Sequence, residues 1–218
     1  MSKRLLLLRH AQLGAEYLGR FVGSSDPGLD AIGQAQARAV SGRLARLAPN
    51  RCYCSPMQRC RQTAAALAGQ RPIQIDDDLR EIDFGRWEGG RFEEIRARDP
   101  ELVGDWAELR PDFAFPEGER LADFLGRVRA AADRLAHDEA ETVLAVTHGG
   151  VIRAMICHLL GLEPRHYVLF NVGYASLAVI DLFDGGGVLS GLQNPDLLPE
   201  AVASDPARAA MPWEVGHG

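Results

Sequence analysis

Short apolar segments alternate with longer helix-like segments along most of this chain, and such alternation is typical of one fold class. Residues 5–8 are four consecutive leucines, and residues 143–146 form a second uninterrupted apolar run. Runs of this kind are typical of strands that are buried on both faces. Four residues are also too few to cross a bilayer or to form the apolar core of a signal peptide. The pattern predicts an α/β fold with a mostly parallel sheet between two layers of helices.

Local signals place the individual elements. We expect strands at residues 3–8, 51–55, 73–75, 141–147 and 174–183, with a hairpin turn at 184–187 leading into a last strand at 188–192. We expect helices at residues 31–47, 57–68, 121–137 and 151–160. Asp30 is expected to cap the first helix, and Gly69 and Gly161 are expected to follow the ends of the second and the last.

The domain organisation follows from length and from the proline-rich segments. A chain of 218 residues fits one domain. Residues 91–120 are too long for a simple connection and are interrupted by prolines, so we interpret them as a small helical lid over the carboxyl edge of the sheet. The predicted architecture is a three-layer α/β/α domain over residues 1–193. Residues 194–218 contain four prolines and little periodicity, and we expect an irregular C-terminal tail there.

Composition and charge narrow the function classes. The chain is 46% hydrophobic and 25% charged, as in an ordinary globular protein, and its formal net charge is −6. A negative protein does not attract nucleic acid or an anionic membrane, so we expect neither as a partner. Since no apolar run in the sequence is long enough for a signal peptide or a membrane span, we expect a cytoplasmic location. Its four cysteines include no C-x-x-C pair, which favours buried reduced thiols over a metal site or a disulfide framework. The sequence leaves a homodimer open.

Five side chains that suit anion chemistry follow predicted strands at the point where each strand ends. They are Arg9, His10, Arg59, Glu81 and His148. Open α/β sheets bind ligands at the carboxyl ends of their strands, so we expect these side chains to lie together. Arginine binds phosphoryl oxygens through two parallel hydrogen bonds and stays charged at any relevant pH. The set therefore predicts a phosphate site in which the two arginines bind the anion.

The remaining residues of the set suit catalysis of phosphate ester cleavage. Neutral imidazole is a nucleophile near neutral pH, so His10 is the candidate to attack phosphorus and form a phosphohistidine. His148, cationic in the presence of phosphate, would stabilise the equatorial oxygens. The backbone N–H groups of Gly149 and Gly150 could add to the same pocket. Glu81 would give a proton to the leaving alcohol and later take one from water.

Each of these residues also has an ordinary interpretation when it is taken alone. Arg59 could pair within its own helix, and Glu81 could pair with Arg80 or Arg86. The shared position at one sheet edge is what favours catalysis. Other charged groups are interpreted as surface or packing residues: Arg127, Arg129, Arg134, His137, His158, His166 and His217.

The chain also resembles the histidine phosphatase superfamily, which is also called the phosphoglycerate mutase-like family. The resemblance runs from about residue 3 to about residue 192. It is carried by "RHA" at 9–11, "GRFVGSSDPGLDAIGQAQA" at 19–37, "SPMQRCRQTA" at 55–64, "LREIDFGRWEG" at 79–89, "FPEGERLADFLGRV" at 115–128 and "VTHGGVIRAM" at 146–155. It implies a phosphorylated His10, a phosphate pocket of Arg9, Arg59 and His148, the proton donor Glu81, and no metal or other cofactor.

The first motif departs from the family pattern at three positions. Ala11, Leu13 and Glu16 stand where the family usually has glycine, serine or threonine, and asparagine. The resemblance implies that Glu16, Val22 and Gly23 bind substrate, and that Gly149 helps to bind phosphate.

Several functions remain open from the sequence. The segment after Glu81 is short, as in the phosphatase branch with its alpha-ribazole and broad-specificity phosphatases, so water is the expected acceptor for the phosphoryl group. A phosphoglycerate mutase-type phosphotransferase is one alternative, and a non-catalytic phospho-ligand binding protein is another. The substrate is expected to be a small phosphate ester. Four aromatic residues are interpreted as an apolar rim for its organic part: Phe21, Trp87, Trp106 and Phe113.

Overall fold

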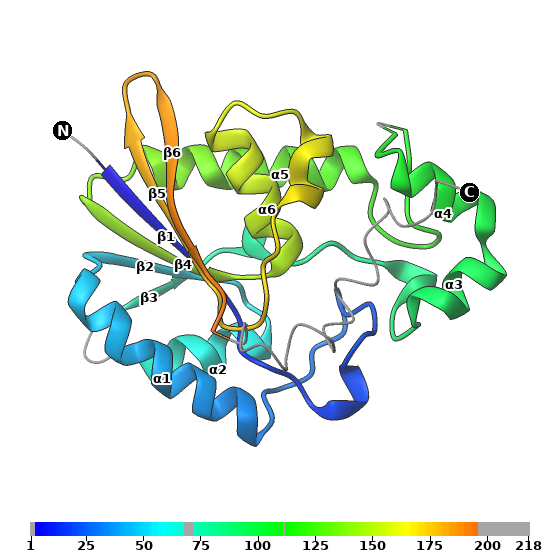
Figure 1. Ribbon diagram of the computed structural model, residues 1–218, viewed down its shortest axis with the longest axis horizontal. Coiled ribbons are helices and arrows are strands. Elements are labelled where there is room, and N and C mark those ends of the chain that lie inside the picture. Colours follow the sequence, from blue (N-terminus) through cyan, green and yellow to red (C-terminus); the bar gives the residue numbers. More distant parts are fainter. Residues whose placement is uncertain (1–2, 68–71, 111, 196–218) are drawn as a thin grey trace.

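A six-stranded sheet forms the centre of the computed structural model, which describes residues 3–67, 72–110 and 112–195 (Figure 1). Its strands are β1 (Lys3–Arg9), β2 (Arg51–Cys54), β3 (Ile73–Ile75), β4 (Thr142–Thr147), β5 (Leu177–Phe183) and β6 (Gly186–Gln193). They lie in the order β3-β2-β4-β1-β5-β6. The first four in this order pair in parallel, whereas β5 runs antiparallel to β1 and to β6. The predicted α/β fold with a mostly parallel sheet is confirmed.

The four leucines of β1 are divided between the two faces of the sheet. All are buried, and successive side chains on a strand point to opposite faces. Leu5 and Leu7 join one core cluster, which includes residues of α5 (Leu121–Ala136) and α6 (Gly149–Leu159). Leu6 and Leu8 join a second cluster with α1 (Ala31–Leu47) and α2 (Gln58–Leu67). Helices therefore cover both faces of the sheet (Figure 1).

The helix boundaries lie within two residues of the predicted ones. The Asp30 carboxylate accepts a hydrogen bond from the Gly33 N–H at 2.6 Å and caps α1 as predicted. Gly161 follows α6 with a φ of +68°, as expected of a glycine after a helix end. α6 begins at Gly149, two residues before the predicted start. Gly69, expected to end α2, lies outside the described residues.

The late strands also begin at positions other than those predicted. β5 starts at Leu177, because residues 173–176 form a turn instead of the expected first part of the strand. β6 already pairs from Gly186, so the turn is shorter than the predicted residues 184–187. The other short helices are α3 (Phe92–Arg98), α4 (Pro100–Ala107) and the 3-10 helices η1 (Ala15–Tyr17), η2 (Asp77–Leu79), η3 (Gly85–Trp87) and η4 (Pro164–Leu169).

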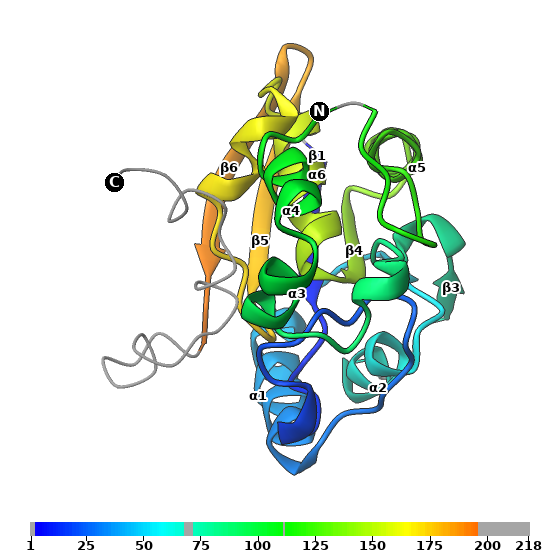
Figure 2. The same cartoon turned by 90° about the vertical axis from the view of Figure 1, so that its right-hand side faces the viewer.

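α3 and α4 lie at the end of the molecule opposite the β5–β6 turn (Figures 1 and 2). The aromatic residues around them pack edge to face: Phe21 against Trp106, Trp87 against Trp106, and Phe113 against Phe115. The predicted apolar rim of Phe21, Trp87, Trp106 and Phe113 is therefore wrong, because all four are buried in the core cluster on the α5–α6 side of the sheet.

The division into a domain at 1–193 with a lid at 91–120 and a tail at 194–218 stays a prediction. Residues 196–218, most of the expected tail, lie outside the described residues. Within the described part of the chain, no helix has the length and apolar character that crossing a bilayer requires.

Candidate active site

The carboxyl ends of β1 and β4 bring two histidines together. These strands are adjacent and parallel, and Arg9 pairs with Thr147 in their register. The next residues along the two strands are His10 and His148. The His10 backbone N–H donates to the Thr147 carbonyl at 2.9 Å, and the two imidazole rings have centroids 5.2 Å apart. Both predicted catalytic histidines thus lie at one point of the sheet edge.

His10 is held in one orientation and in its neutral form. Its Nδ1 lies 2.8 Å from the Ala11 carbonyl oxygen, which can only accept, so Nδ1 carries the hydrogen. Burial, and then the charges of Arg59 and Arg9, hold the pKa of His10 well below 6.5. Its Nε2 therefore carries a free lone pair, which is what a nucleophile needs.

Arg59 reaches from α2 across to a loop and to the second histidine. It is fully buried, and its Nη1 and Nη2 donate to the carbonyls of Ser25 and Gly23 at 2.6 and 2.8 Å. Its Nε donates to His148 Nδ1 at 3.2 Å. The alternative in which Arg59 pairs within its own helix is not what the structure shows. The guanidinium lies beside His148, with three of its donors in fixed positions.

The hydrogen bond from Arg59 also sets the tautomer of His148. Because Nδ1 accepts from Arg59, Nε2 carries the hydrogen and donates to Ser55 Oγ at 2.9 Å. Burial, followed by the charge of Arg59, lowers the pKa of His148 well below 6.5. His148 is therefore neutral without an anion beside it. The expected cationic form belongs to the phosphate-bound state and stays a prediction.

Arg9 is the second cation of the site. Its Nη1 donates to the Val172 carbonyl at 2.6 Å, and its guanidinium carbon lies 4.2 Å from the centre of the Tyr174 ring. The Tyr174 ring lies against His10 as well, with centroids 5.6 Å apart. The Nε of Arg9 is buried and has no hydrogen-bond partner among the described residues. Sequence reasoning did not single out Tyr174, although Gly173 before it is a turn signal.

Glu81 lies against the first turn of α6. Its Oε2 accepts from the Gly150 N–H at 3.0 Å. A Cβ at position 150 would lie 2.5 Å from Glu81 Oε1, so this contact requires glycine. The expectation that the Gly150 N–H joins the phosphate pocket is wrong, because that group donates to Glu81. Gly149 lies beside Arg9 instead, where an added Cβ would stand 3.4 Å from Nε.

A guanidinium of α5 supports the segment that carries Glu81. Arg127 donates to the carbonyls of Asp78, Arg80 and Glu81 at 2.9, 2.6 and 3.1 Å. The Glu119 carboxylate holds the same guanidinium at 2.7 and 2.9 Å. The interpretation of Arg127 as part of a solvated face is therefore wrong. Helix periodicity gives the direction of a side chain but does not reveal which loop packs against it.

A carboxylate supports the loop that holds Arg59. Glu88 Oε1 accepts from the backbone N–H groups of Gly23 and Ser24 at 2.9 and 2.8 Å, and Oε2 accepts from Ser25 Oγ at 2.6 Å. The carbonyls of the same loop bind Arg59. Glu88 is a second residue that the sequence reasoning missed, although it lies within the "LREIDFGRWEG" motif.

The three predicted substrate-binding residues have different surroundings. Gly23 is buried, and both its N–H and its carbonyl are bonded within the protein. Glu16 is exposed in η1, and Val22 is half-buried. Among the described residues, no interaction joins the side chain of Glu16 or Val22 to His10. Direct contact of these three residues with substrate stays a prediction.

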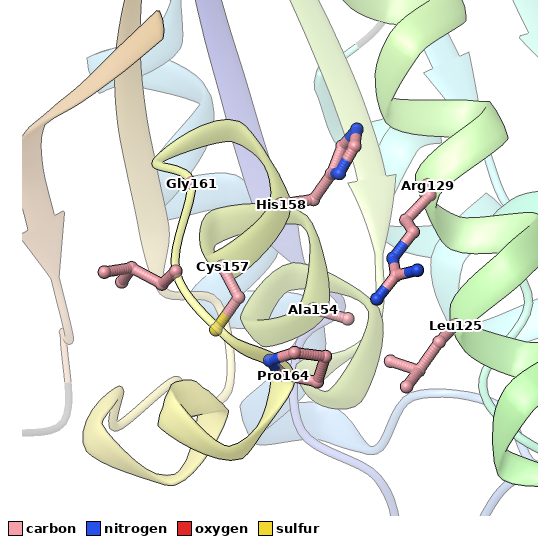
Figure 3. Close-up of a pocket in the computed structure, with 8 residues that line it drawn as sticks. Leu125, Arg129, Ala154, Cys157, His158, Gly161 and Pro164 are labelled. Carbon is pink, nitrogen blue, oxygen red and sulfur yellow. The ribbon is translucent and has the colours of Figure 1, made fainter. Parts of the chain in front are cut away.

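A cavity of about 300 Å³ lies elsewhere, between α5 and α6 (Figure 3). Arg129 and Leu125 line it from α5, and Cys157 and His158 line it from α6. None of the predicted site residues lines it. Burial raises the pKa of Cys157 to about 11, so its thiol is protonated at neutral pH.

Relatives of the chain are found over most of its length. The model of the histidine phosphatase superfamily (branch 1) matches residues 5–195. A bifunctional protein of Mycobacterium tuberculosis is 39% identical over 189 residues, which cover 84% of this chain and 51% of that protein. The chain thus spans about half the length of this relative.

Two further relatives are matched over most of their own length. Phosphoserine phosphatase 1 of Hydrogenobacter thermophilus is 32% identical over 189 residues, which cover 85% of this chain and 90% of that enzyme. The crystal structure of the alpha-ribazole phosphatase from Shigella flexneri has a TM-score of 0.79 at 27% identity and covers 88% of this chain and 96% of that one.

Proposed function

Because this chain belongs to the histidine phosphatase superfamily, we propose that it hydrolyses a phosphate monoester through a phosphohistidine on His10. The observation that carries the proposal is the state of His10. Its Nδ1 is hydrogen-bonded to a carbonyl, its Nε2 is unprotonated, and a second histidine and two arginines surround it. Relatives named as phosphatases support water as the final acceptor.

In the first step, His10 Nε2 attacks phosphorus and the bond from phosphorus to the ester oxygen breaks. Glu81 gives its proton to the departing oxygen, so that the alcohol leaves neutral. Proton transfer of this kind typically contributes ~10²–10⁴-fold to the rate. Arg9 and Arg59 bind the phosphoryl oxygens, and His148, cationic once the anion is present, stabilises the charge on them.

In the second step, a water molecule attacks the phosphorus and the bond to His10 breaks. Glu81, now a carboxylate, takes a proton from that water. Inorganic phosphate leaves, and His10 returns to its neutral form. Two neighbouring cations serve both steps, since they lower the pKa of His10 and also bind the anion that it attacks.

The proposal includes the finer expectations about the partners of the protein. The substrate is a small phosphate ester, and neither nucleic acid nor a membrane is a partner. The protein works in the cytoplasm, and a homodimer is compatible with the proposal. The metal-independence of the reaction is part of the proposal too, and it needs its own test.

The test is hydrolysis of p-nitrophenyl phosphate in EDTA by the unmodified protein, His10→Ala and His158→Ala. His158 is the matched control, since it is paired with Asp133 beside the separate cavity. We expect turnover in EDTA for the unmodified protein and the control, and none for His10→Ala. Labelled substrate should leave a phosphoryl group on His10 that is labile in acid and stable in alkali.

Other outcomes would favour the alternatives. Turnover that stops in EDTA and returns with a divalent cation would contradict the metal-free mechanism. Turnover that requires a bisphosphorylated primer would indicate a mutase. Tight binding of phosphate compounds without turnover would indicate a binding protein.

A further inference from the structure

The turn that precedes β5 is unusual in its backbone. Ser176 donates from its N–H and from its hydroxyl to the Gly173 carbonyl, which closes the turn. Ala175, inside the turn, is buried and has a φ of +53°. A left-handed conformation is unfavourable for alanine and persists only where the surrounding structure enforces it.

That enforcement comes from the residues at the end of β1. The Ala175 N–H donates to the His10 carbonyl at 3.1 Å, and the Arg9 N–H donates to the Ser176 carbonyl at 3.0 Å. The turn is thus bonded on both sides to the proposed phosphate-binding arginine and the proposed nucleophile. Strained backbone that is held in this way is often found at functional sites.

The strained turn places the Tyr174 ring over the Arg9 guanidinium and against the His10 imidazole. A guanidinium over an aromatic face is attracted to the ring, which limits its rotation. The Val172 carbonyl, from the same segment, holds Nη1. One face of the guanidinium is thus covered and Nη1 is bonded, while Nε is buried and has no hydrogen-bond partner among the described residues.

We infer that Tyr174 is a positioning residue of the phosphate site, which keeps the Arg9 guanidinium and the His10 ring in the arrangement that binds and attacks a phosphoryl group. The inference rests on the function proposed above. The aromatic face is the active part of Tyr174, because its hydroxyl makes no hydrogen bond with the described residues. Without the ring, a single bond to the Val172 carbonyl would restrain the guanidinium.

The variants Tyr174→Phe and Tyr174→Leu separate the ring from the hydroxyl. Tyr174 is only half-buried, so neither variant should unfold the protein, and thermal melting checks this. Phe183→Leu is the matched control, because Phe183 is an exposed aromatic residue at the far end of β5. The measurements are the dissociation constant of orthovanadate by calorimetry, and kcat and KM for p-nitrophenyl phosphate.

We expect Tyr174→Phe and Phe183→Leu to bind orthovanadate within about twofold of the unmodified protein. Tyr174→Leu should bind it about tenfold more weakly, the size expected for a lost cation–π contact. Its KM should rise by more than its kcat falls, because the ring acts on the binding of the anion. If Tyr174 had a purely structural role, its substitution would lower the melting temperature without raising KM more than it lowers kcat.

A double-mutant cycle in kcat/KM tests whether the ring acts through Arg9. In an Arg9→Met background, Tyr174→Leu should cost less than it does in the unmodified protein, because only the contact of the ring with His10 remains. Equal losses with and without Arg9, unchanged binding in Tyr174→Leu, or equal losses in the phenylalanine and leucine variants would each overturn the inference.

The same measurements separate this inference from the proposed function. If the unmodified protein binds orthovanadate but hydrolyses no ester, the proposed hydrolysis fails, while the binding data still decide the role of Tyr174. If the unmodified protein hydrolyses the ester, and Tyr174→Leu has the same kinetic constants and binds orthovanadate equally well, only the inference fails. If the unmodified protein neither binds orthovanadate nor hydrolyses the ester, both are overturned.

Discussion

At the scale of single residues, the site depends on histidines that are kept neutral. Burial is the first cause for both His10 and His148, and the charge of Arg59 is the second. Each histidine also has one ring nitrogen in a hydrogen bond that determines its tautomer. The proposed nucleophile, His10, therefore needs no separate base to deprotonate it.

The depressed pKa values of these two histidines predict how stability depends on pH. Below pH 6.5 the unfolded chain binds a proton at each histidine that the folded protein does not bind. The free energy of unfolding should therefore fall as the pH drops through 6.5, with a slope from this pair that approaches about 2.7 kcal/mol per pH unit. Urea unfolding at a series of pH values between about 7.5 and 5.5 measures this change in the free energy of unfolding.

The control for this prediction is His10→Gln, which removes one of the two histidines that bind a proton only in the unfolded chain. In this variant the histidine contribution to the slope of unfolding free energy against pH should be about half that in the unmodified protein. A stability that is equal at both ends of this pH range would mean that the histidines are protonated in the folded protein.

Two adjacent glycines give a matched pair of substitutions. Gly150→Ala places a Cβ 2.5 Å from Glu81 Oε1 and must displace the carboxylate, whereas Gly149→Ala leaves an ordinary contact of 3.4 Å with Arg9 Nε. We expect kcat/KM for an ester to fall about 100-fold in Gly150→Ala, the lower end of what a positioned acid contributes. Gly149→Ala should stay within about threefold, since it keeps its own backbone N–H for the phosphate and leaves Glu81 in place. Similar losses in both would contradict the placement of Glu81.

At the scale of elements, two loops position residues of the candidate site, and side chains from other elements hold those loops. Arg127 of α5 binds three carbonyls of residues 78–81, and Glu88 binds three N–H groups and a hydroxyl of residues 23–25. The first loop leads to Glu81, and the second holds Arg59. Both supports are polar because the backbone groups that they satisfy are polar.

Arg127→Met tests the first support. It leaves three carbonyls and the Glu119 carboxylate without their donor, so we expect a loss of about 2 kcal/mol in stability. In the proposed mechanism Glu81 protonates the leaving group. Activity on an alkyl phosphate should therefore fall much more than activity on p-nitrophenyl phosphate, whose leaving group needs little protonation. Glu81→Gln should show the same pattern.

The control for Arg127→Met is Arg134→Met on the same helix. Arg134 is half-exposed and pairs with the side chains of Asp76 and Asp78. Exposed pairs contribute little, so this variant should change neither stability nor leaving-group dependence appreciably. If Arg127→Met and Arg134→Met each lower activity on the alkyl ester and on p-nitrophenyl phosphate by the same factor, Arg127 does not act through Glu81.

At the scale of the whole molecule, the candidate site joins segments that are far apart in the sequence. Arg9 ends β1 and His10 follows it, α2 supplies Arg59, and His148 follows β4. The molecule has a formal net charge of −6, so the attraction for an anion must come from the two arginines at the site. A ligand bound there contacts several elements and binds only the folded state.

Ligand binding should therefore stabilise the entire fold. Orthovanadate at about 100 times its dissociation constant adds about 2.7 kcal/mol, which raises the melting temperature by roughly 5–10 °C for a chain of this size. His10→Ala should show a smaller rise, and Phe183→Leu an equal one. An unchanged melting temperature in the unmodified protein would show that the site does not bind the anion.

The strands and the position of the site could be predicted because both depend on local sequence. The apolar residues 5–8 and 143–146 form strands wherever they are buried on two faces, and parallel neighbours place their carboxyl ends together. His10 and His148 then meet because each follows directly after its strand. The predicted start of β5 was less accurate. Ser176 donates to Gly173 within a turn and Ala175 donates to the distant His10, so these residues form a turn instead of the first part of the strand.

The amino-acid sequence by itself determined the fold class and the order of most elements, and it predicted the five charged or titratable residues of the candidate site. The tertiary structure alone decided what each long side chain contacts. Arg127, Glu88 and Tyr174 act on segments that are distant in sequence, and four aromatic residues expected at a rim are packed in the core. Strand formation depends on neighbouring residues, whereas the partner of a side chain depends on which distant segments the fold brings within reach.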